Sequence, residues 1–397
     1  MNPPSSTTKS RVNEAVVALP PSGIREFFDL VIGMDDLISL GVGEPDFVTP
    51  WNVREQAIFT MEKGYTTYTS NKGLLELRRE IAKYMEERFD QAYSPEDEVL
   101  VTVGASQGLD LSMRAILNPG DEVIVTEPCY VAYTPMVRLA GGVPKILQLK
   151  YENTFRLDAD ELESLITPRT KAMLLNYPCN PTGSTFREEE CRRIAEIAEK
   201  HDLIMITDEI YAELTYDQEH FCMANMPGAR DRTIVLNGFS KAFAMTGWRM
   251  GFAAGPPDLI AAMTKIFQYS MLSAPIMSQY AAVEALKSRK RNVPGMIESY
   301  HQRRNYFVQG LRDIGIDCHL PEGAFYAFPS IEKFGITARE FCTRLLKEEK
   351  VAVVPGSAFT SNGGEKFLRC SYAVSMDELK QALEAMERLI KRIQAGD

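Results

Sequence analysis

Residues 233–252 read TIVLNGFSKAFAMTGWRMGF, a stretch that places one lysine shortly after an apolar run. The run Thr233–Leu236 is typical of a strand buried in a sheet, and Lys241 follows it among glycines, small residues and aromatic residues. Arg249 lies eight positions further on. A lysine is almost never fully buried unless something pairs with it, because its charge is costly to remove from water. The lysine at the end of this core strand therefore needs a chemical explanation.

Similar short apolar runs precede this one along the chain. They are Val99–Val103, Glu122–Thr126, Ala172–Asn176 and Leu203–Thr207. The segments between them have the periodicity of covering helices, as in Glu188–His201, where apolar residues recur every three or four positions. This alternation predicts an α/β fold with a large, doubly wound, mostly parallel sheet.

The C-terminal part has a different pattern. Capping-box sequences, Thr337 with Glu340 and Ser375 with Glu378, open two amphipathic helices. Short strand-like runs accompany them, at Ala324–Phe328, Val351–Val354 and Phe367–Cys370. We therefore expect a smaller α+β domain over 290–397, a large domain over 49–289, and an N-terminal arm over 1–48 that joins the small domain.

The composition argues against several classes of partner. The net charge of −10 over 397 residues argues against nucleic acid or an anionic membrane surface as a partner. The seven cysteines are scattered without a CxxC pair and the four histidines are dispersed, so we expect reduced thiols and no metal site. The N-terminus lacks the apolar region of a signal peptide, and no run approaches transmembrane length. These features predict a soluble, cytoplasmic protein.

Small and polar residues follow each predicted strand, where an open parallel sheet binds its ligands. In chain order they are Gly104–Gly108, Glu127–Tyr130, Tyr177–Gly183, Asp208–Tyr211 and Asn237–Lys241. Taken alone, each has an ordinary explanation, such as a glycine turn, a loop, a helix N-cap at Asp208 or packing at Tyr130. Five such coincidences at five strand ends favour one shared ligand.

A single cofactor accounts for these residue types. A lysine shielded from water can have a lowered pKa and form a Schiff base with an aldehyde. Pyridoxal 5′-phosphate carries such an aldehyde, a ring nitrogen that needs a carboxylate partner, and a phosphate that binds helix N-termini, hydroxyls and guanidinium groups. The chain offers matching groups in Lys241, Asp208, the backbone amides of Ala105, Ser106 and Gln107, the Ser240 hydroxyl and Arg249.

The stretch GFSKAFAMTGWRMG at 238–251 resembles the lysine signature of class I pyridoxal-phosphate-dependent aminotransferases of fold type I. Other matches follow the family order: GVGEPD at 41–46, Tyr68 in YTSNKGLLELR, NPTG at 180–183 and Arg369 in FLRCSYA. Within the class, the chain is most similar to the subgroup that contains aromatic, aspartate and N-acetyl-diaminopimelate aminotransferases.

The resemblance implies catalytic roles for Lys241, Asp208 and Tyr211. Lys241 would carry the cofactor and, once released by the substrate, move a proton between the substrate Cα and the cofactor. Asp208 would keep the pyridine nitrogen protonated. Asn180 and Tyr211 would hydrogen-bond the phenolic oxygen of the ring, and Tyr130 would stack on the ring face.

The resemblance also implies how the phosphate and the substrate are bound. The phosphate would be held by Ser106, Ser240, Arg249 and Tyr68, with Tyr68 reaching over from the second subunit of a homodimer. Arg369, together with Asn180, would bind the substrate α-carboxylate, a bidentate task that lysine performs poorly. Gly43 would allow the N-terminal segment to close over the substrate.

The implied reaction is a ping-pong transfer of an amino group from an L-amino acid to a 2-oxo acid such as 2-oxoglutarate. One aspartate-using branch of the family has a lysine in the phosphate-binding turn, where this chain has Ser106. Ile24, Phe325 and Tyr326 suit a bulky or aromatic side chain near the mouth of the site, although all three could be core residues. We expect an aromatic or broad-range donor.

Three alternatives remain open at this stage. They are an aspartate aminotransferase, an N-acetyl-diaminopimelate aminotransferase, and a β-lyase on the same fold, whose cofactor site would be nearly identical. A ligand-sensing regulator is disfavoured, because the sequence shows no basic helix-turn-helix and its net charge is negative.

Overall fold

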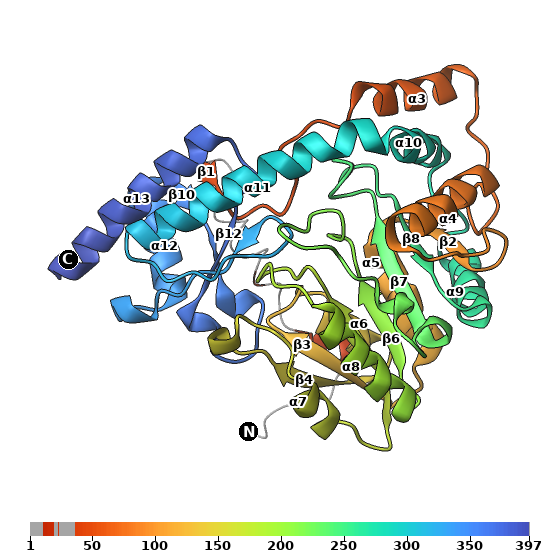
Figure 1. The fold of residues 1–397 in the computed structure, drawn as a ribbon, viewed down its shortest axis with the longest axis horizontal. Coiled ribbons are helices and arrows are strands. Elements are labelled where there is room, and N and C mark those ends of the chain that lie inside the picture. The colour runs from red at the N-terminus through yellow and green to blue at the C-terminus, as the bar shows by residue number, and fades with distance from the viewer. Residues whose placement is uncertain (1–10, 20–22, 24–35, 397) are drawn as a thin grey trace, which may run out of the picture.

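The structure is a computed structural model that describes residues 11–19, 23 and 36–396 (Figure 1). Its centre is a seven-stranded sheet in the order β2-β8-β7-β6-β5-β3-β4. The strands are β2 (Val99–Thr102), β3 (Glu122–Glu127), β4 (Val143–Gln148), β5 (Thr170–Asn176), β6 (Ile204–Asp208), β7 (Thr233–Gly238) and β8 (Gly251–Ala254). Strands β4, β3, β5, β6 and β7 run parallel, whereas β8 runs antiparallel to both of its neighbours. The predicted α/β fold is therefore confirmed.

The five predicted strands all lie in this sheet, and the two that were not predicted have other residue patterns. Strand β4 lies at the sheet edge and contains a proline, a lysine and half-exposed positions, so it lacks a continuous apolar run. Strand β8 is four residues long and begins with glycine. An edge strand needs less apolar surface than a central one, which explains why the apolar pattern did not reveal β4.

Alternate side chains of each strand enter different core clusters on the two faces of the sheet. On one face Val123 and Leu174 pack with apolar residues of α5 (Gly104–Ile116), α6 (Tyr133–Leu139) and α9 (Pro257–Ser270). On the other face Ile124 and Leu175 pack with residues of α8 (Glu188–Lys200). This alternation follows from the two-residue period of a strand. It leaves the ends of the strands free to carry polar side chains.

The remaining helices lie beside the large sheet or in the C-terminal part of the chain, as Figure 1 shows. They are α1 (Glu14–Val17), α3 (Trp51–Glu62), α4 (Leu75–Phe89), α7 (Ala159–Ser164), α10 (Ile276–Lys287), α11 (Arg289–Asp313), α12 (Ala338–Glu349) and α13 (Met376–Ala395). Figure 1 shows α11 as a long helix that begins beside α10 and ends in the C-terminal part of the chain. The predicted capping box at Ser375 has both of its hydrogen bonds to Glu378, and at α12 the Thr337 hydroxyl accepts from the Glu340 amide.

A small antiparallel sheet forms the centre of the C-terminal part. It contains β11 (Val354–Pro355), β12 (Leu368–Ser371) and β9 (Tyr326–Ala327) in that order. Strand β1 (Ile38–Ser39) pairs with β10 (Val351–Ala352), so the segment before α3 lies against C-terminal residues. The division of the chain at residues 48 and 289 stays a prediction.

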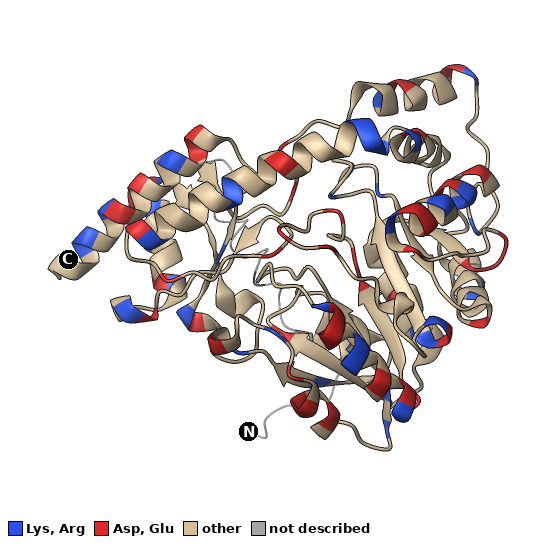
Figure 2. Cartoon of the chain, in the orientation of Figure 1, with Lys and Arg blue, Asp and Glu red and all other residues tan. Residues whose placement is uncertain are grey.

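The outer helices carry charges of both signs side by side, as Figure 2 shows for α4, α8 and α13. Within the described ranges, no helix combines the length and the apolar character that crossing a membrane requires. The seven cysteines, all of which lie in these ranges, are buried and free.

Candidate active site

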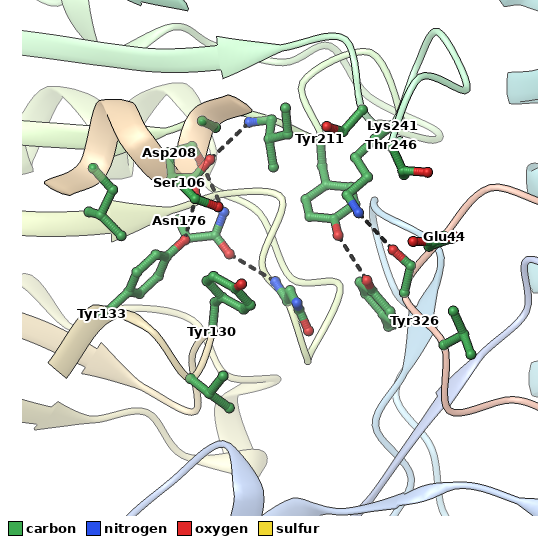
Figure 3. A pocket seen from close by; sticks show the side chains of 18 of the residues that line it. Glu44, Ser106, Tyr130, Tyr133, Asn176, Asp208, Tyr211, Lys241, Thr246 and Tyr326 are labelled. Carbon is green, nitrogen blue, oxygen red and sulfur yellow. Dashed lines mark hydrogen bonds between the residues drawn. The ribbon is translucent and has the colours of Figure 1, made fainter. Parts of the chain in front are cut away.

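The residues that follow the parallel strands line one cavity of about 660 Å³ (Figure 3). This volume lies in the usual range for small-molecule sites. Of the predicted site residues, the cavity lining includes Gly43, Ala105, Ser106, Tyr130, Asn180, Asp208, Tyr211, Ser240, Lys241, Arg249 and Arg369. The structure thus brings together residues from five strand ends, from the segment before α3 and from β12.

Lys241 follows β7 and extends into the cavity. Its Nζ donates a hydrogen bond of 2.7 Å to the carbonyl oxygen of Gly43. Burial lowers the pKa of Lys241 to about 8, an effect that the carboxylate of Glu44 opposes and the guanidinium of Arg369 adds to. A lowered pKa increases the neutral, nucleophilic fraction of the amine near neutral pH. The lowered pKa gives a chemical reason for a buried lysine at the end of a core strand.

Asp208 ends β6 as a buried carboxylate. The Tyr133 hydroxyl donates to its Oδ2 at 2.7 Å, and the Ile210 amide donates to Oδ1 at 3.3 Å. Burial nevertheless raises the pKa of Asp208 to about 6, although both hydrogen bonds lower it. A buried anion of this kind is stabilised by a nearby cation. A protonated pyridine nitrogen would supply one.

The first turn of α5 forms a cradle for an anion with Arg249. Gly104 has a φ of +72°, and a Cβ built on it would lie 2.8 Å from Nη2 of Arg249. A Cβ on Gly251 would lie 2.6 Å from the Ala105 amide nitrogen, so glycine is required there for the backbones to approach. The helix N-terminus directs N–H groups and a partial positive charge at the cavity. The Ser106 and Ser240 side chains complete a set of groups that suits a phosphate.

Arg369 lies in β12 and is only 3% exposed. Its Nη1 donates to Asn180 Oδ1 at 3.1 Å and its Nη2 donates to the Gly41 carbonyl at 2.5 Å. Its Nε is buried without a hydrogen-bond partner among the described residues. A buried donor left unpaired is unfavourable, so this guanidinium is well suited to receive a carboxylate from a ligand.

Two of the predicted site residues that the structure describes, Gln107 and Tyr68, are not among the residues that line the cavity. The side chain of Gln107 turns back, and its Oε1 accepts a hydrogen bond of 2.7 Å from the Val103 amide. Tyr68 is 81% exposed and is not part of the lining. Ile24 lies outside the described residues. Of the two aromatic residues expected near the mouth, Tyr326 lines the cavity, whereas Phe325 is fully buried in the core.

Sequence reasoning missed several lining residues, above all Tyr133 and Asn176. Asn176 donates from Nδ2 to the Asp208 carbonyl at 2.8 Å and accepts from the Asn180 amide at 2.9 Å, so it ties two strand ends together. Its position as the last residue of β5 was a signal that could have been used. Tyr133 gave a weaker signal, since only the turn into α6 directs its hydroxyl to Asp208.

The donor set fits pyridoxal 5′-phosphate. The amine of Lys241 suits its aldehyde, the buried carboxylate of Asp208 suits its ring nitrogen, and the α5 N-terminus with Arg249 suits its phosphate. The fold and the site together define an enzyme of the kind that uses this cofactor. Residues 35–386 match the family described as aminotransferase class I and II, and the chain belongs to that family, whose members depend on pyridoxal phosphate.

Known proteins of this family are similar to the chain over nearly its whole length. It is 54% identical to the YugH protein of Bacillus subtilis (strain 168) over 383 residues, which are 96% of this chain and 99% of that protein. It is 43% identical to an aspartate aminotransferase of Pyrococcus abyssi (strain GE5 / Orsay), covering 94% of this chain and 96% of the relative. The crystal structure of an aromatic aminotransferase from Pyrococcus horikoshii OT3 superimposes with a TM-score of 0.88 at 41% identity, covering 94% and 99% of the two chains.

Replacing Asp208 by asparagine should stabilise the cofactor-free protein while it lowers aminotransferase activity. Because the folded protein holds the pKa near 6, above the ordinary value of 3.8, it binds more protons than the unfolded chain between these pH values. The free energy of unfolding therefore falls as the pH rises through this range, by up to about 3 kcal/mol. Urea unfolding at about pH 8 should show the variant to be more stable, with little difference at about pH 4.

The exposed Asp97 provides the control for this comparison. Asp97→Asn should leave the unfolding free energy nearly unchanged at both pH values. An equal gain for Asp208→Asn at both pH values would contradict the assignment of the effect to ionisation of Asp208.

Proposed function

We propose that this aminotransferase takes an aromatic or a broad range of L-amino acids as donors and a 2-oxo acid such as 2-oxoglutarate as acceptor, by a ping-pong mechanism. The observation that supports the donor class is the charge of the cavity lining. Among the described lining residues, the cationic side chains are those of Lys241, Arg249 and Arg369, and each suits another part of the cofactor or substrate. The part of the lining that the structure describes therefore offers no further cation for a second carboxylate on the substrate.

Aromatic and apolar side chains occupy much of the remaining lining. They are Val42, Leu109, Tyr130, Val131, Tyr133, Ile210, Tyr211 and Tyr326. Such a surface favours an apolar or aromatic substrate side chain through burial and ring contacts. The position in the phosphate-binding turn that carries a lysine in one aspartate-using branch is Ser106 here.

The proposed mechanism assigns each side chain a separate task. Pyridoxal phosphate, when bound, supplies an electron sink for the bonding electrons released at the substrate Cα. Lys241 would take the proton from the substrate Cα and pass it to the cofactor, a task for which a pKa near 8 is suitable. Asp208 would balance the positive charge of the protonated ring nitrogen, and the Tyr133 hydroxyl keeps Asp208 in place.

Substrate orientation depends on Arg369 and Asn180. The two side chains are already joined by a hydrogen bond, so a carboxylate meets a preorganised pair. Tyr211 would donate to the phenolic oxygen of the cofactor. Arg249, with Ser106, Ser240 and the α5 N-terminus, would hold the phosphate.

A panel of half-reactions tests the donor class. The purified holoenzyme is mixed with tyrosine, phenylalanine, aspartate, alanine or a diaminopimelate derivative, and the loss of the cofactor's visible absorbance is followed in a stopped-flow instrument. We expect tyrosine and phenylalanine to react at least about tenfold faster than aspartate at equal concentration, since burial of an aromatic side chain is worth a few kcal/mol.

The same panel separates the alternatives. If aspartate or the diaminopimelate derivative reacts fastest, the proposed donor class is wrong and the corresponding alternative holds. A β-lyase would turn over continuously with one amino acid and no acceptor, whereas an aminotransferase stops after one half-reaction.

We also propose that the protein works as a homodimer in which Tyr68 reaches the phosphate of the other subunit. An exposed apolar surface on α3 and the segment after it supports this proposal. It includes Trp51, Ile58, Phe59, Met61, Tyr65 and Tyr68. Contiguous exposed apolar residues commonly mark an interface between protein chains. Light scattering should give twice the chain mass of 44.6 kDa, and a monomeric mass would contradict the proposal.

A further inference from the structure

Tyr326 contacts three functional groups of the site at once. Its hydroxyl lies 2.8 Å from the Tyr211 hydroxyl, and its ring centroid lies 4.6 Å from the guanidinium carbon of Arg369. A Cβ built on Gly43 would lie 2.4 Å from the same hydroxyl. The Gly43 carbonyl in turn accepts the hydrogen bond from Lys241. Figure 3 shows the hydrogen bond that joins the two tyrosine hydroxyls, with Lys241 nearby.

The Tyr211–Tyr326 pair has two protons but only one shared hydrogen bond. Burial raises the pKa of both phenols, so both remain protonated at neutral pH. One hydroxyl must donate to the other, and the second proton is then free to point elsewhere. If Tyr326 donates, the free proton belongs to Tyr211 and can be offered to a ligand.

Arg369 favours this direction of donation. Its positive charge lies against the Tyr326 ring and lowers the pKa of Tyr326. Only burial, which raises this pKa, has a larger effect. Arg369 also lowers the pKa of Tyr211, but burial and the contacts with Tyr326 change that pKa more. The more acidic phenol is the better hydrogen-bond donor, so the guanidinium makes Tyr326 the donor of the pair.

We propose that Tyr326 is a positioning residue that donates to the Tyr211 hydroxyl and thereby directs the Tyr211 proton to the phenolic oxygen of the cofactor. This inference rests on the proposed role of Tyr211. It gives Tyr326 a second task, because the same ring packs against the guanidinium that binds the substrate carboxylate. Gly43 belongs to the arrangement as well, since a larger residue there would displace the Tyr326 hydroxyl.

The visible absorbance of the bound cofactor tests the proposal without measuring turnover. The cofactor-loaded enzyme is titrated with pH, and the midpoint of the absorbance change is compared between wild type and Tyr326→Phe. Removing the donor weakens the hydrogen bond from Tyr211, so the phenolic oxygen becomes more basic. We expect the midpoint to rise by about 0.5 pH unit, in line with the loss of part of one hydrogen bond.

A double-mutant cycle assigns this shift to Tyr211. Tyr211→Phe alone should raise the midpoint more than Tyr326→Phe does, and adding Tyr326→Phe to that variant should raise it no further. Tyr372→Phe is the matched control, because Tyr372 is also fully buried and donates to the Ala324 carbonyl at 3.2 Å, away from the lining. It should leave the midpoint unchanged.

Two results would overturn the inference, and they are distinguishable from each other. If Tyr211→Phe raises the midpoint but Tyr326→Phe does not, Tyr211 acts without Tyr326 and only the inference fails. If Tyr211→Phe leaves the midpoint unchanged, the proposed role of Tyr211 fails first. Should Tyr326→Phe not fold, Gly43→Ala replaces it in the cycle, because the added methyl group would meet the same hydroxyl.

Discussion

The Lys241→Ala variant should lose at least about 10⁴-fold of its rate in a single half-reaction, because both the covalent attachment of the cofactor and the proton transfer at Cα depend on this amine. The effect should appear in the rate constant at saturating amino acid. Binding of the amino acid should change less, since Arg369 and Asn180 remain joined by their hydrogen bond. Stopped-flow absorbance measures the rate. Mass spectrometry after borohydride reduction should show cofactor attached to the peptide that contains Lys241 in wild type only.

The exposed Lys265 on α9 provides the control for Lys241. Lys265→Ala should keep both the half-reaction rate and the attached cofactor. A Lys241→Ala protein that transaminates at a rate close to wild type, or a cofactor attached to another lysine in wild type, would contradict the proposed centre of the mechanism.

The Arg369→Lys variant should lose about 10²-fold in kcat/KM for amino acids, because lysine keeps the charge but loses the second of two charge-assisted hydrogen bonds to the carboxylate. The loss should depend on the carboxylate of the substrate. Steady-state kinetics with the preferred amino acid and with the corresponding amine that lacks the carboxylate measure this dependence. The amine should react slowly with wild type. Its rate with the variant should be nearly the same as its rate with wild type.

Arg304 is a suitable control for the loss of a buried arginine. It is 2% exposed and packs over the Tyr216 ring, much as Arg369 packs over Tyr326, but it does not line the cavity. Arg304→Lys should leave kcat/KM within about threefold of wild type, as is usual for a change outside the site. Arg369 would have a structural role only if Arg369→Lys and Arg304→Lys lost equal factors in kcat/KM. The same would follow if Arg369→Lys lost as large a factor with the amine as with the amino acid.

The central strands and their polar ends could be predicted from the sequence because one physical rule covers both. Parallel strands buried on two faces need short, continuous apolar runs, and their carboxyl ends lie together at one edge. Lys241 and Asp208 could therefore be placed in one site, because Lys241 follows β7 and Asp208 ends β6. The cofactor needs an amine for its aldehyde and a carboxylate for its ring nitrogen, so its chemistry gave each of these two residues a role.

Contacts that depend on packing between distant segments could not be predicted in this way. The bond from Tyr133 to Asp208 depends on the orientation of α6 against the sheet, which no local pattern records. The pairing of Arg369 with Asn180 joins residues 189 positions apart, and only the family resemblance placed Arg369 at the site. Tyr326 was expected near the mouth for its bulk, whereas its bond to Tyr211 follows from the three-dimensional arrangement alone.

Backbone carbonyls in the segment before α3 accept hydrogen bonds from Lys241 and Arg369, the same donors that the ligands require. Gly41 accepts from Arg369 and Gly43 accepts from Lys241, so two carbonyls separated by one residue each accept a hydrogen bond from one of these cations in the cofactor-free protein. Ligand binding is then an exchange of hydrogen-bond partners, and its free energy is a difference between two well-bonded states. A bound cofactor would replace the Gly43 carbonyl at Lys241, and a substrate carboxylate would replace the Gly41 carbonyl at Arg369. The short segment from Gly41 to Gly43 thus competes with the ligands for these two donors.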